Sequence, residues 1–221
     1  DREATVTSAM KDIWVFAAVR EGALEPETAG LIAESRDLLS GSGGAGTVTV
    51  VALGSGLTPA LEPLGALGAD RVIYAEDDFF GRYQGELFSA VLFDLVQKYS
   101  PSCILMAQGP ETADLSVRLA ARMETGLITR AMDYRMNSEG KGVAVRPVAN
   151  GYLFEELIME DTDCPIITFL PSVLHDPESR EPGETEILLE SPDIASFDVK
   201  TKVVEVVEAD PGQLDLEEAD I

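Results

Sequence analysis

The sequence predicts an α/β fold, a three-layer sandwich in which helices cover both faces of a mostly parallel sheet. Two observations support this expectation. Apolar runs of strand length recur along the chain, and they alternate with segments whose apolar residues recur every three or four positions, as they do on one face of a helix. Strands and helices that alternate in this way form a parallel sheet through right-handed crossovers.

The first element expected is a buried strand over residues 12–20, whose letters DIWVFAAVR are almost all apolar. Pro26 suits the first turn of the helix that follows this strand. Thr112 or Asp114 is expected to cap the fourth helix, and Gly126 to end it. The other elements expected in this half are strands over residues 47–53, 71–75 and 103–107 and helices over residues 58–67, 85–99 and 115–123.

The pattern changes at residue 127. Strand-like runs over residues 127–136, 142–148, 152–159 and 166–170 follow with short connections, and residues 138–142 read as a hairpin turn. These strands are expected to extend the Rossmann-like sheet in an antiparallel sense. Beyond residue 172 the chain is polar and rich in proline. Residues 186–190 and 201–208 resemble strands with few local partners, which would join another sheet in this domain or in a partner chain.

The composition narrows the possible partners. The chain has 221 residues with 40 acidic and 16 basic side chains, and its net charge is −24. This charge repels nucleic acid and anionic membrane surfaces, and no apolar run approaches the length of a membrane span, about 20 residues. We therefore expect proteins or small molecules as partners.

The two cysteines, Cys103 and Cys164, lie in apolar, strand-like runs and are expected to be buried thiols in a reducing compartment. The sequence contains no Cys/His cluster of metal-binding spacing, so no metal is expected. The first ten residues lack the features of a signal or transit peptide. A bacterial or archaeal cytoplasm is the expected location.

Two glycine-rich loops are candidates for nucleotide binding. Residues 41–46 (GSGGAG) match G-x-G-x-x-G, but this loop follows a helix and precedes a strand, whereas a dinucleotide loop must follow a strand and open a helix. The correctly placed loop is Gly54, Ser55 and Gly56, although Pro59 occupies its third glycine position. These three residues are weak candidates for nucleotide binding.

No catalytic residue is expected. The single histidine, His175, lies in a polar loop without an obvious partner. Glu155 and Glu156 are adjacent in a strand-like run, so their side chains are expected on opposite faces, where they cannot act on one substrate atom. The acidic residues 76–78 are expected to form a solvated loop.

Several motifs together carry a family resemblance. RLAARMETGL begins at Arg118, RPVANGY at Arg146 and ITFLPSV at Ile167, and VALGSG begins earlier, at Val51. In this order they resemble the N-terminal domain of the electron transfer flavoprotein alpha subunit, and the resemblance covers nearly the whole chain. It implies an N-terminal extension over residues 1–11, an α/β domain over residues 12–175, and a tail and linker over residues 176–221 that lead toward an FAD-binding domain absent from this chain.

The resemblance also implies a function. The chain is expected to be a scaffold domain that pairs with an electron transfer flavoprotein beta subunit and supports FAD-mediated electron transfer from a dehydrogenase, for example an acyl-CoA dehydrogenase, to an acceptor. FAD would be bound mainly by the absent domain, and the partner subunit is the candidate for binding AMP. The alternative is a free-standing module that binds AMP or ATP at the carboxyl ends of the strands, near residues 18–21, 54–56 and 108–110.

Overall fold

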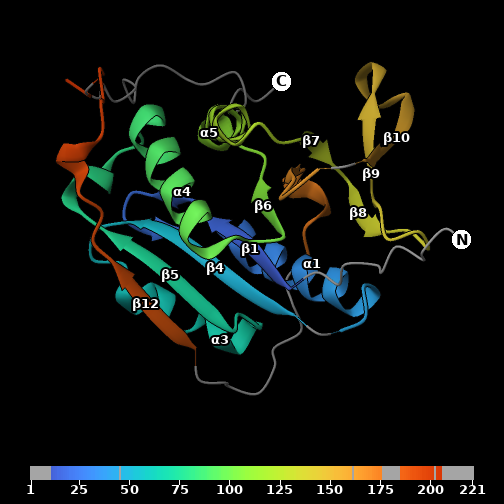
Figure 1. Cartoon of the computed structure of the whole chain (residues 1–221), viewed down its shortest axis with the longest axis horizontal. Coiled ribbons are helices and arrows are strands. Elements are labelled where there is room, and N and C mark those ends of the chain that lie inside the picture. Colours follow the sequence, from blue (N-terminus) through green and yellow to red (C-terminus); the bar gives the residue numbers. More distant parts are fainter. Residues whose placement is uncertain (1–10, 45, 161, 176–184, 202, 206–221) are drawn as a thin grey trace, which may run out of the picture.

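The central element of the structure, a computed structural model, is a parallel sheet of seven strands (Figure 1). The structure describes residues 11–44, 46–160, 162–175, 185–201 and 203–205. Every neighbouring pair in this sheet is parallel. In spatial order the strands are β12 (Glu186–Glu190), β5 (Arg71–Glu76), β4 (Thr47–Gly54), β1 (Asp12–Ala17), β6 (Cys103–Ala107), β11 (Ile166–Phe169) and β7 (Leu127–Ala131).

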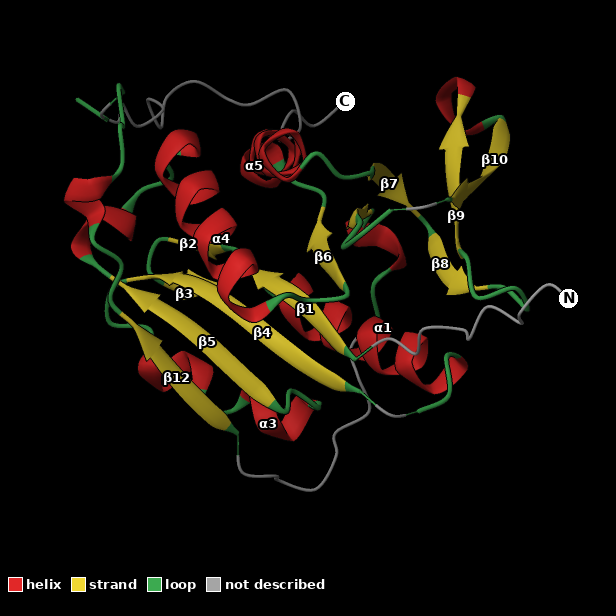
Figure 2. Ribbon diagram, in the orientation of Figure 1, coloured by secondary structure: helices red, strands yellow, loops and turns green. Residues whose placement is uncertain are grey.

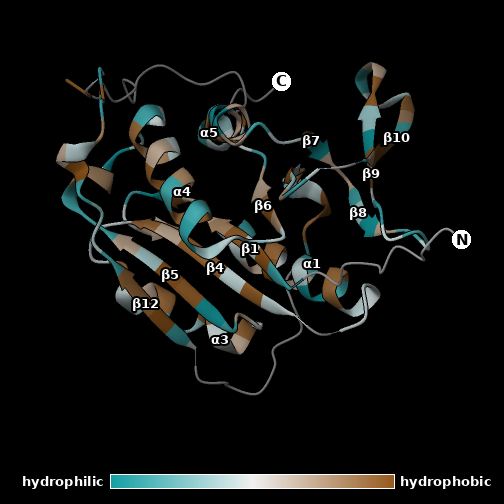
Figure 3. Ribbon diagram, in the orientation of Figure 1, coloured by the Kyte–Doolittle hydropathy of each residue, from teal (hydrophilic) through white to brown (hydrophobic). Residues whose placement is uncertain are grey.

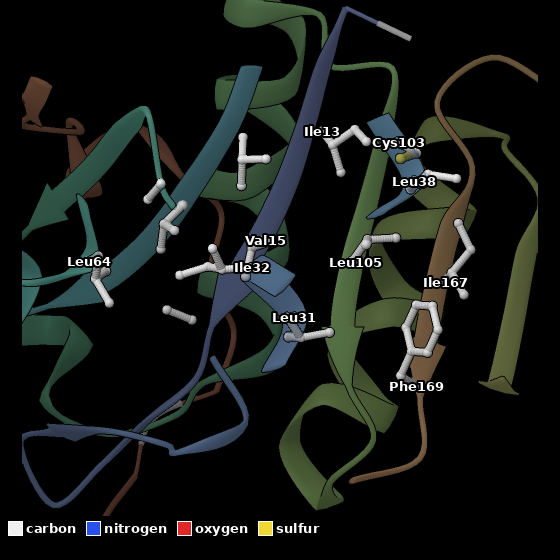
Figure 4. Packing of buried hydrophobic residues seen from close by; sticks show 14 of the residues in the cluster. Ile13, Val15, Leu31, Ile32, Leu38, Leu64, Cys103, Leu105, Ile167 and Phe169 are labelled. Carbon is white, nitrogen blue, oxygen red and sulfur yellow. The ribbon is translucent and has the colours of Figure 1, made fainter. Parts of the chain in front are cut away.

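Helices cover both faces of this sheet (Figure 2). On one face α1 (Glu27–Gly41), α2 (Thr58–Leu61) and α3 (Leu64–Leu67) pack on a core that includes Ile13, Leu105 and Phe169 (Figure 4). On the other face α4 (Gly85–Tyr99) and α5 (Pro110–Met123) cover a second core that includes Trp14. The predicted three-layer α/β fold is confirmed.

The antiparallel strands form a second sheet, in the order β10 (Leu153–Met159), β9 (Gly142–Val148) and β8 (Asp133–Met136), and do not extend the first. The run over residues 127–136, expected as one strand, divides at Met132. Arg130 has a left-handed φ of 60° where the pairing of β7 with β11 is irregular, and the Met132 N–H donates to Val145 O at 2.7 Å. A bulge of this kind redirects a strand, and here it sends the chain from one sheet to the other.

Two other predicted elements are shorter than expected. The strand over residues 12–20 ends at Ala17. Val19 and Arg20 form a separate short strand, β2 (Val19–Arg20), which pairs with β3 (Ala23–Leu24) in a small hairpin whose turn is made by Glu21 and Gly22 at positive φ. The helix over residues 58–67 divides into α2 and α3 at Pro63, which has no N–H to continue the helical bonding. Gly41 ends α1 and β4 begins at Thr47, so the loop over residues 41–46 joins a helix to a strand as expected.

The N-cap of α5 is Gly109, and neither Thr112 nor Asp114 takes that position. The helix begins at Pro110, and Thr112 lies within its first turn, where its hydroxyl accepts from Gly109 N at 2.8 Å and donates to Ala107 O at 2.5 Å. At the other end Glu124, with φ of 52°, takes the left-handed position that was expected for Gly126. Gly126 instead allows a close contact, because a Cβ there would lie 2.5 Å from Met159 Cε.

The tail returns to the central sheet. The strand expected at Glu186–Glu190 is present as β12, which pairs with β5 and so joins this domain's own sheet. Of the second expected strand, over residues 201–208, Thr201 and residues 203–205 are not in a strand, and the rest lies outside the described residues. Four 3-10 turns complete the elements: η1 (Asp78–Gly81), η2 (Ala149–Gly151), η3 (Pro171–Val173) and η4 (Ile194–Ser196).

Candidate protein interface

The small sheet lies beyond β7 and carries β10 as its outermost strand (Figure 1). The strand pairs with β9 in an unbroken antiparallel register from Leu153 opposite Val148 to Met159 opposite Gly142. Among the described residues β9 is its only partner strand, so the other edge of β10 presents backbone N–H and C=O groups to the surroundings.

One face of the small sheet is attached to the core of the domain. Tyr134 and Ala144 are buried, and Leu157 and Met159 of β10 pack against the same cluster. Burial raises the pKa of the Tyr134 phenol. These contacts hold the ribbon of β9 and β10 in a fixed position relative to the large sheet.

The start of β10 and its opposite face carry exposed apolar side chains. Figure 3, in which the ribbon is coloured by hydropathy, shows hydrophobic residues along β10. The exposed fraction is 87% for Tyr152, 62% for Leu153, 61% for Phe154 and 51% for Ile158. These four residues, which we name the β10 patch, are four of the ten large hydrophobic side chains that are exposed among the described residues. A concentration of exposed apolar side chains on one ribbon is typical of a surface that binds another protein.

Ion pairs flank the β10 patch. Arg135 on β8 pairs with Asp133 and, at 2.8 Å, with Glu156 of β10, while Arg146 on β9 pairs with Glu155. The two glutamates therefore use different arginines on opposite faces, as the alternation of a strand predicts. Pairs this exposed contribute little to stability, but they orient the strands and give the apolar surface a charged rim.

The turn that leads into the β10 patch has an unusual backbone. Ala149, Asn150 and Gly151 have successive positive φ values of 50°, 57° and 85°. A left-handed conformation costs free energy for a residue with a Cβ, so a run of three is kept only where the surrounding structure enforces it. The turn reverses the chain between β9 and β10 and directs Tyr152 outward.

Sequence reasoning placed a strand at β10 but did not detect this surface. Apolar residues occur at both even and odd positions from Tyr152 to Met159, a pattern that also fits a strand buried on both faces. The available signal was the pair Glu155 and Glu156, because adjacent charged residues in such a run show that neither face is fully buried.

The loop of Gly54, Ser55 and Gly56 lies at the carboxyl edge of the sheet, as expected, but its polar groups are bound within the chain. Gly56 N donates to Glu76 Oε1 at 3.1 Å, and Ser55 Oγ donates to Asp78 Oδ1 at 2.8 Å. In a phosphate loop these donors would face the ligand. Here both donors are hydrogen-bonded to carboxylates of the same chain.

A cavity of about 60 Å³ opens beside this loop, between the ends of β1 and β4, η1 and the start of α5. Small-molecule sites commonly measure roughly 300–1,000 Å³, so this cavity is too small for a nucleotide. Glu21 and Glu111 line it together with Arg82, and burial raises the pKa of the Glu111 carboxyl.

The remaining residues singled out from the sequence lie apart from one another. His175 is exposed, and its backbone packs against Gly30 of α1. Cys103 is buried, Cys164 is partly buried, and both are free thiols. No group of His, Cys, Asp and Glu in the described part of the chain could hold a metal ion. Likewise, none of the helices described combines the length and the apolar character needed to span a membrane.

The fold and the site define a Rossmann-like α/β domain that carries an exposed apolar ribbon. The chain belongs to the electron transfer flavoprotein family, because residues 13–210 match the family described as Electron transfer flavoprotein domain.

Curated relatives agree with this assignment. The chain is 32% identical to the electron transfer flavoprotein subunit alpha of Bacillus subtilis over 96% of this chain and 62% of that protein. It is 26% identical to the subunit of the same name from Thermoanaerobacterium thermosaccharolyticum, with coverages of 96% and 63%. It is also 27% identical to the acryloyl-CoA reductase electron transfer subunit beta of Anaerotignum propionicum, with coverages of 97% and 65%. The chain thus spans less than two thirds of each relative's length.

Proposed function

We propose that this chain is the scaffold domain of an electron transfer flavoprotein alpha subunit and that the β10 patch binds the beta subunit. The pair supports FAD-mediated transfer of electrons from a dehydrogenase, for example an acyl-CoA dehydrogenase, to an acceptor. In this role the chain is part of an electron carrier and not an enzyme. The observation that carries the proposal is the exposed apolar ribbon in a family whose curated members are named as subunits.

The cofactor is assigned to other parts of the complex. The loop of Gly54 to Gly56 already binds Glu76 and Asp78, and the cavity of about 60 Å³ beside it is too small for a flavin. We therefore propose that FAD binds mainly to the region of the longer relatives that this chain does not cover. AMP is assigned to the partner subunit in the same proposal.

The domain limits and the location are proposals of the same kind. We propose that the α/β domain over residues 12–175 is followed by a tail and linker over residues 176–221, whose strand β12 completes the sheet. Both cysteines are free thiols, which is typical of a reducing compartment, so we propose a cytoplasmic location.

The test is binding of a recombinant beta subunit from the same source, measured by calorimetry and by size-exclusion chromatography. We expect a one-to-one complex, and we expect the isolated chain to self-associate through its apolar surface. Substitution of an aromatic residue at the centre of an interface commonly costs about 2 kcal/mol or more. Phe154→Ser should therefore weaken the complex by roughly thirtyfold.

Leu189→Ser is the matched control. Leu189 and Phe154 are both 61% exposed, but Leu189 lies on β12, at the other edge of the molecule. Its substitution should leave the affinity unchanged. Equal effects of the two substitutions would exclude the β10 patch, and a monodisperse monomer that ignores the beta subunit would overturn the proposed pairing. Micromolar binding of AMP or ATP to the chain alone would instead support a nucleotide-binding module.

A further inference from the structure

The segment after β12 lies across helix α4. We name residues 191–201 the strap. Three of its side chains, Ile194, Phe197 and Val199, are half-buried and pack against the core on the α4 side. The neighbouring Asp198 and Lys200 are exposed. Figure 1 shows this segment, in red, next to the end of β12 and close to the start of α4. The strap thus packs on the core through Ile194, which belongs to the 3-10 turn η4, and through Phe197 and Val199 after it.

A carboxylate holds the beginning of the strap. Glu190, the last residue of β12, accepts two hydrogen bonds from Lys98 Nζ at 2.7 and 2.9 Å and a third from the Tyr99 hydroxyl. Lys98 and then Tyr99 lower the pKa of the Glu190 carboxyl. Both donors lie in the last turn of α4. These hydrogen bonds, which we name the first clasp, therefore join the end of β12 to the end of the helix.

A second carboxylate holds the end of the strap. Glu86 Oε2 accepts from Lys200 N at 2.8 Å, from Thr201 N at 3.0 Å and from Thr201 Oγ1 at 3.1 Å. These backbone donors are the main cause of the lowered pKa of the Glu86 carboxyl. Glu86 stands in the first turn of α4, where an acidic residue commonly complements the helix dipole, and here it also binds the backbone of a segment more than 110 residues away.

Side chains of α5 and the residue Tyr83 surround the base of this second clasp. Asp114 and Arg118 of α5 form an ion pair at 2.7 Å, and the Tyr83 hydroxyl donates to the same aspartate at 2.8 Å. The pair lies against Gly85, where a Cβ would approach Asp114 Oδ2 to 2.3 Å. The glycine therefore permits α5 to rest on the first turn of α4, next to Glu86.

We propose that Glu86 is a positioning residue that fixes the point at which the tail leaves the surface of the domain, and that loss of the Glu86 carboxylate releases the strap while β12 stays paired. Beyond the clasp the Val204 side chain is 84% exposed and therefore makes little contact with the domain. Tyr83 and Phe88, next to Glu86 in sequence, line the cavity at the carboxyl edge of the sheet. The part of the chain that follows Thr201 therefore starts beside the carboxyl edge of the sheet. This inference does not depend on the proposed partner.

The test is hydrogen exchange of the full chain, followed by NMR at the amides of Lys200 and Thr201. Removal of a charged acceptor from two backbone donors should accelerate exchange at both amides by about tenfold in Glu86→Ala. Glu86→Gln, which keeps an oxygen acceptor without the charge, should give a smaller acceleration. Glu27→Ala is the matched control, because Glu27 is the acidic residue in the first turn of α1 and should change exchange at neither amide.

The outcomes separate clearly. Faster exchange at Lys200 and Thr201 with unchanged exchange in β12 supports the proposal. Unchanged exchange at both amides in Glu86→Ala overturns it, and so does equal acceleration in β12, because the strap and the strand would then open as one unit. If Glu86→Ala does not fold, Glu86→Gln carries the same comparison.

Discussion

Glu34 on α1 gives the fold a specific pH dependence. Its carboxyl is partly buried, and burial, followed by the nearby charges of Asp133 on β8 and Asp37 on α1, raises its pKa from 4.5 to about 7. The folded state therefore binds a proton more tightly than the unfolded state does. This group's contribution to stability is complete below about pH 4.5 and is lost as the pH rises to about 7.

The magnitude follows from the size of the shift. Each unit of pKa difference corresponds to about 1.4 kcal/mol, so the full shift from 4.5 to about 7 sets an upper limit of about 3 kcal/mol. Glu34 is not fully buried, and partial access of solvent screens the effect. We therefore expect that Glu34→Gln, which removes the ionisation, raises the free energy of unfolding at pH 8 by about 1–2 kcal/mol more than it does at pH 4.5.

The assay is urea denaturation of the wild type and of Glu34→Gln at pH 4.5, 6, 7 and 8. Glu62→Gln is the control, because Glu62 is an exposed residue between two helices and its substitution should have the same small effect at every pH. The reasoning about Glu34 would be refuted by a stability difference that does not change with pH, or by one that changes in the opposite direction.

Two further predictions concern packing and thiol chemistry. Gly30→Ala should destabilise the protein by about 1–3 kcal/mol, because the new Cβ would lie 2.7 Å from Leu174 Cβ. Gly41→Ala in the same helix meets open space and should be neutral or slightly stabilising in the same thermal melts. Burial raises the pKa of Cys103 strongly and that of Cys164 to about 12, so at pH 8 a thiol reagent should label both cysteines slowly in the native protein and rapidly in urea; fast native labelling would contradict the burial.

Much of the architecture follows from local pattern. The continuous apolar run of β1, the helical spacing of α4 and the buried strand β6 are each visible in the letters, because the period of apolar residues reports which faces are covered. The family resemblance was readable for the same reason, since its motifs are contiguous. The glycine-rich loop over residues 41–46 could also be predicted to join a helix to a strand, because the order of the elements on either side of it is visible in the local pattern.

Other features depend on contacts between residues far apart in the sequence. The hydrogen bond from Gly56 N to Glu76 depends on the pairing of β4 with β5, which brings these distant residues together. The bulge at Arg130 that divides the two sheets likewise depends on the pairing of β7 with β11, which lie far apart in the sequence.

The sequence by itself determined a parallel α/β domain and its family, because short runs of neighbouring residues are enough to indicate both. The tertiary structure decided which surfaces stay open and what holds the tail. Phe154 and Leu157 are similarly apolar, but one is exposed and the other packs on the core. In the sequence Glu86 is an ordinary acidic residue in the first turn of a helix. Only the tertiary structure shows that it accepts a hydrogen bond from the backbone of Thr201. Burial and long-range hydrogen bonds are properties of the packed chain, and no local pattern of residues specifies them.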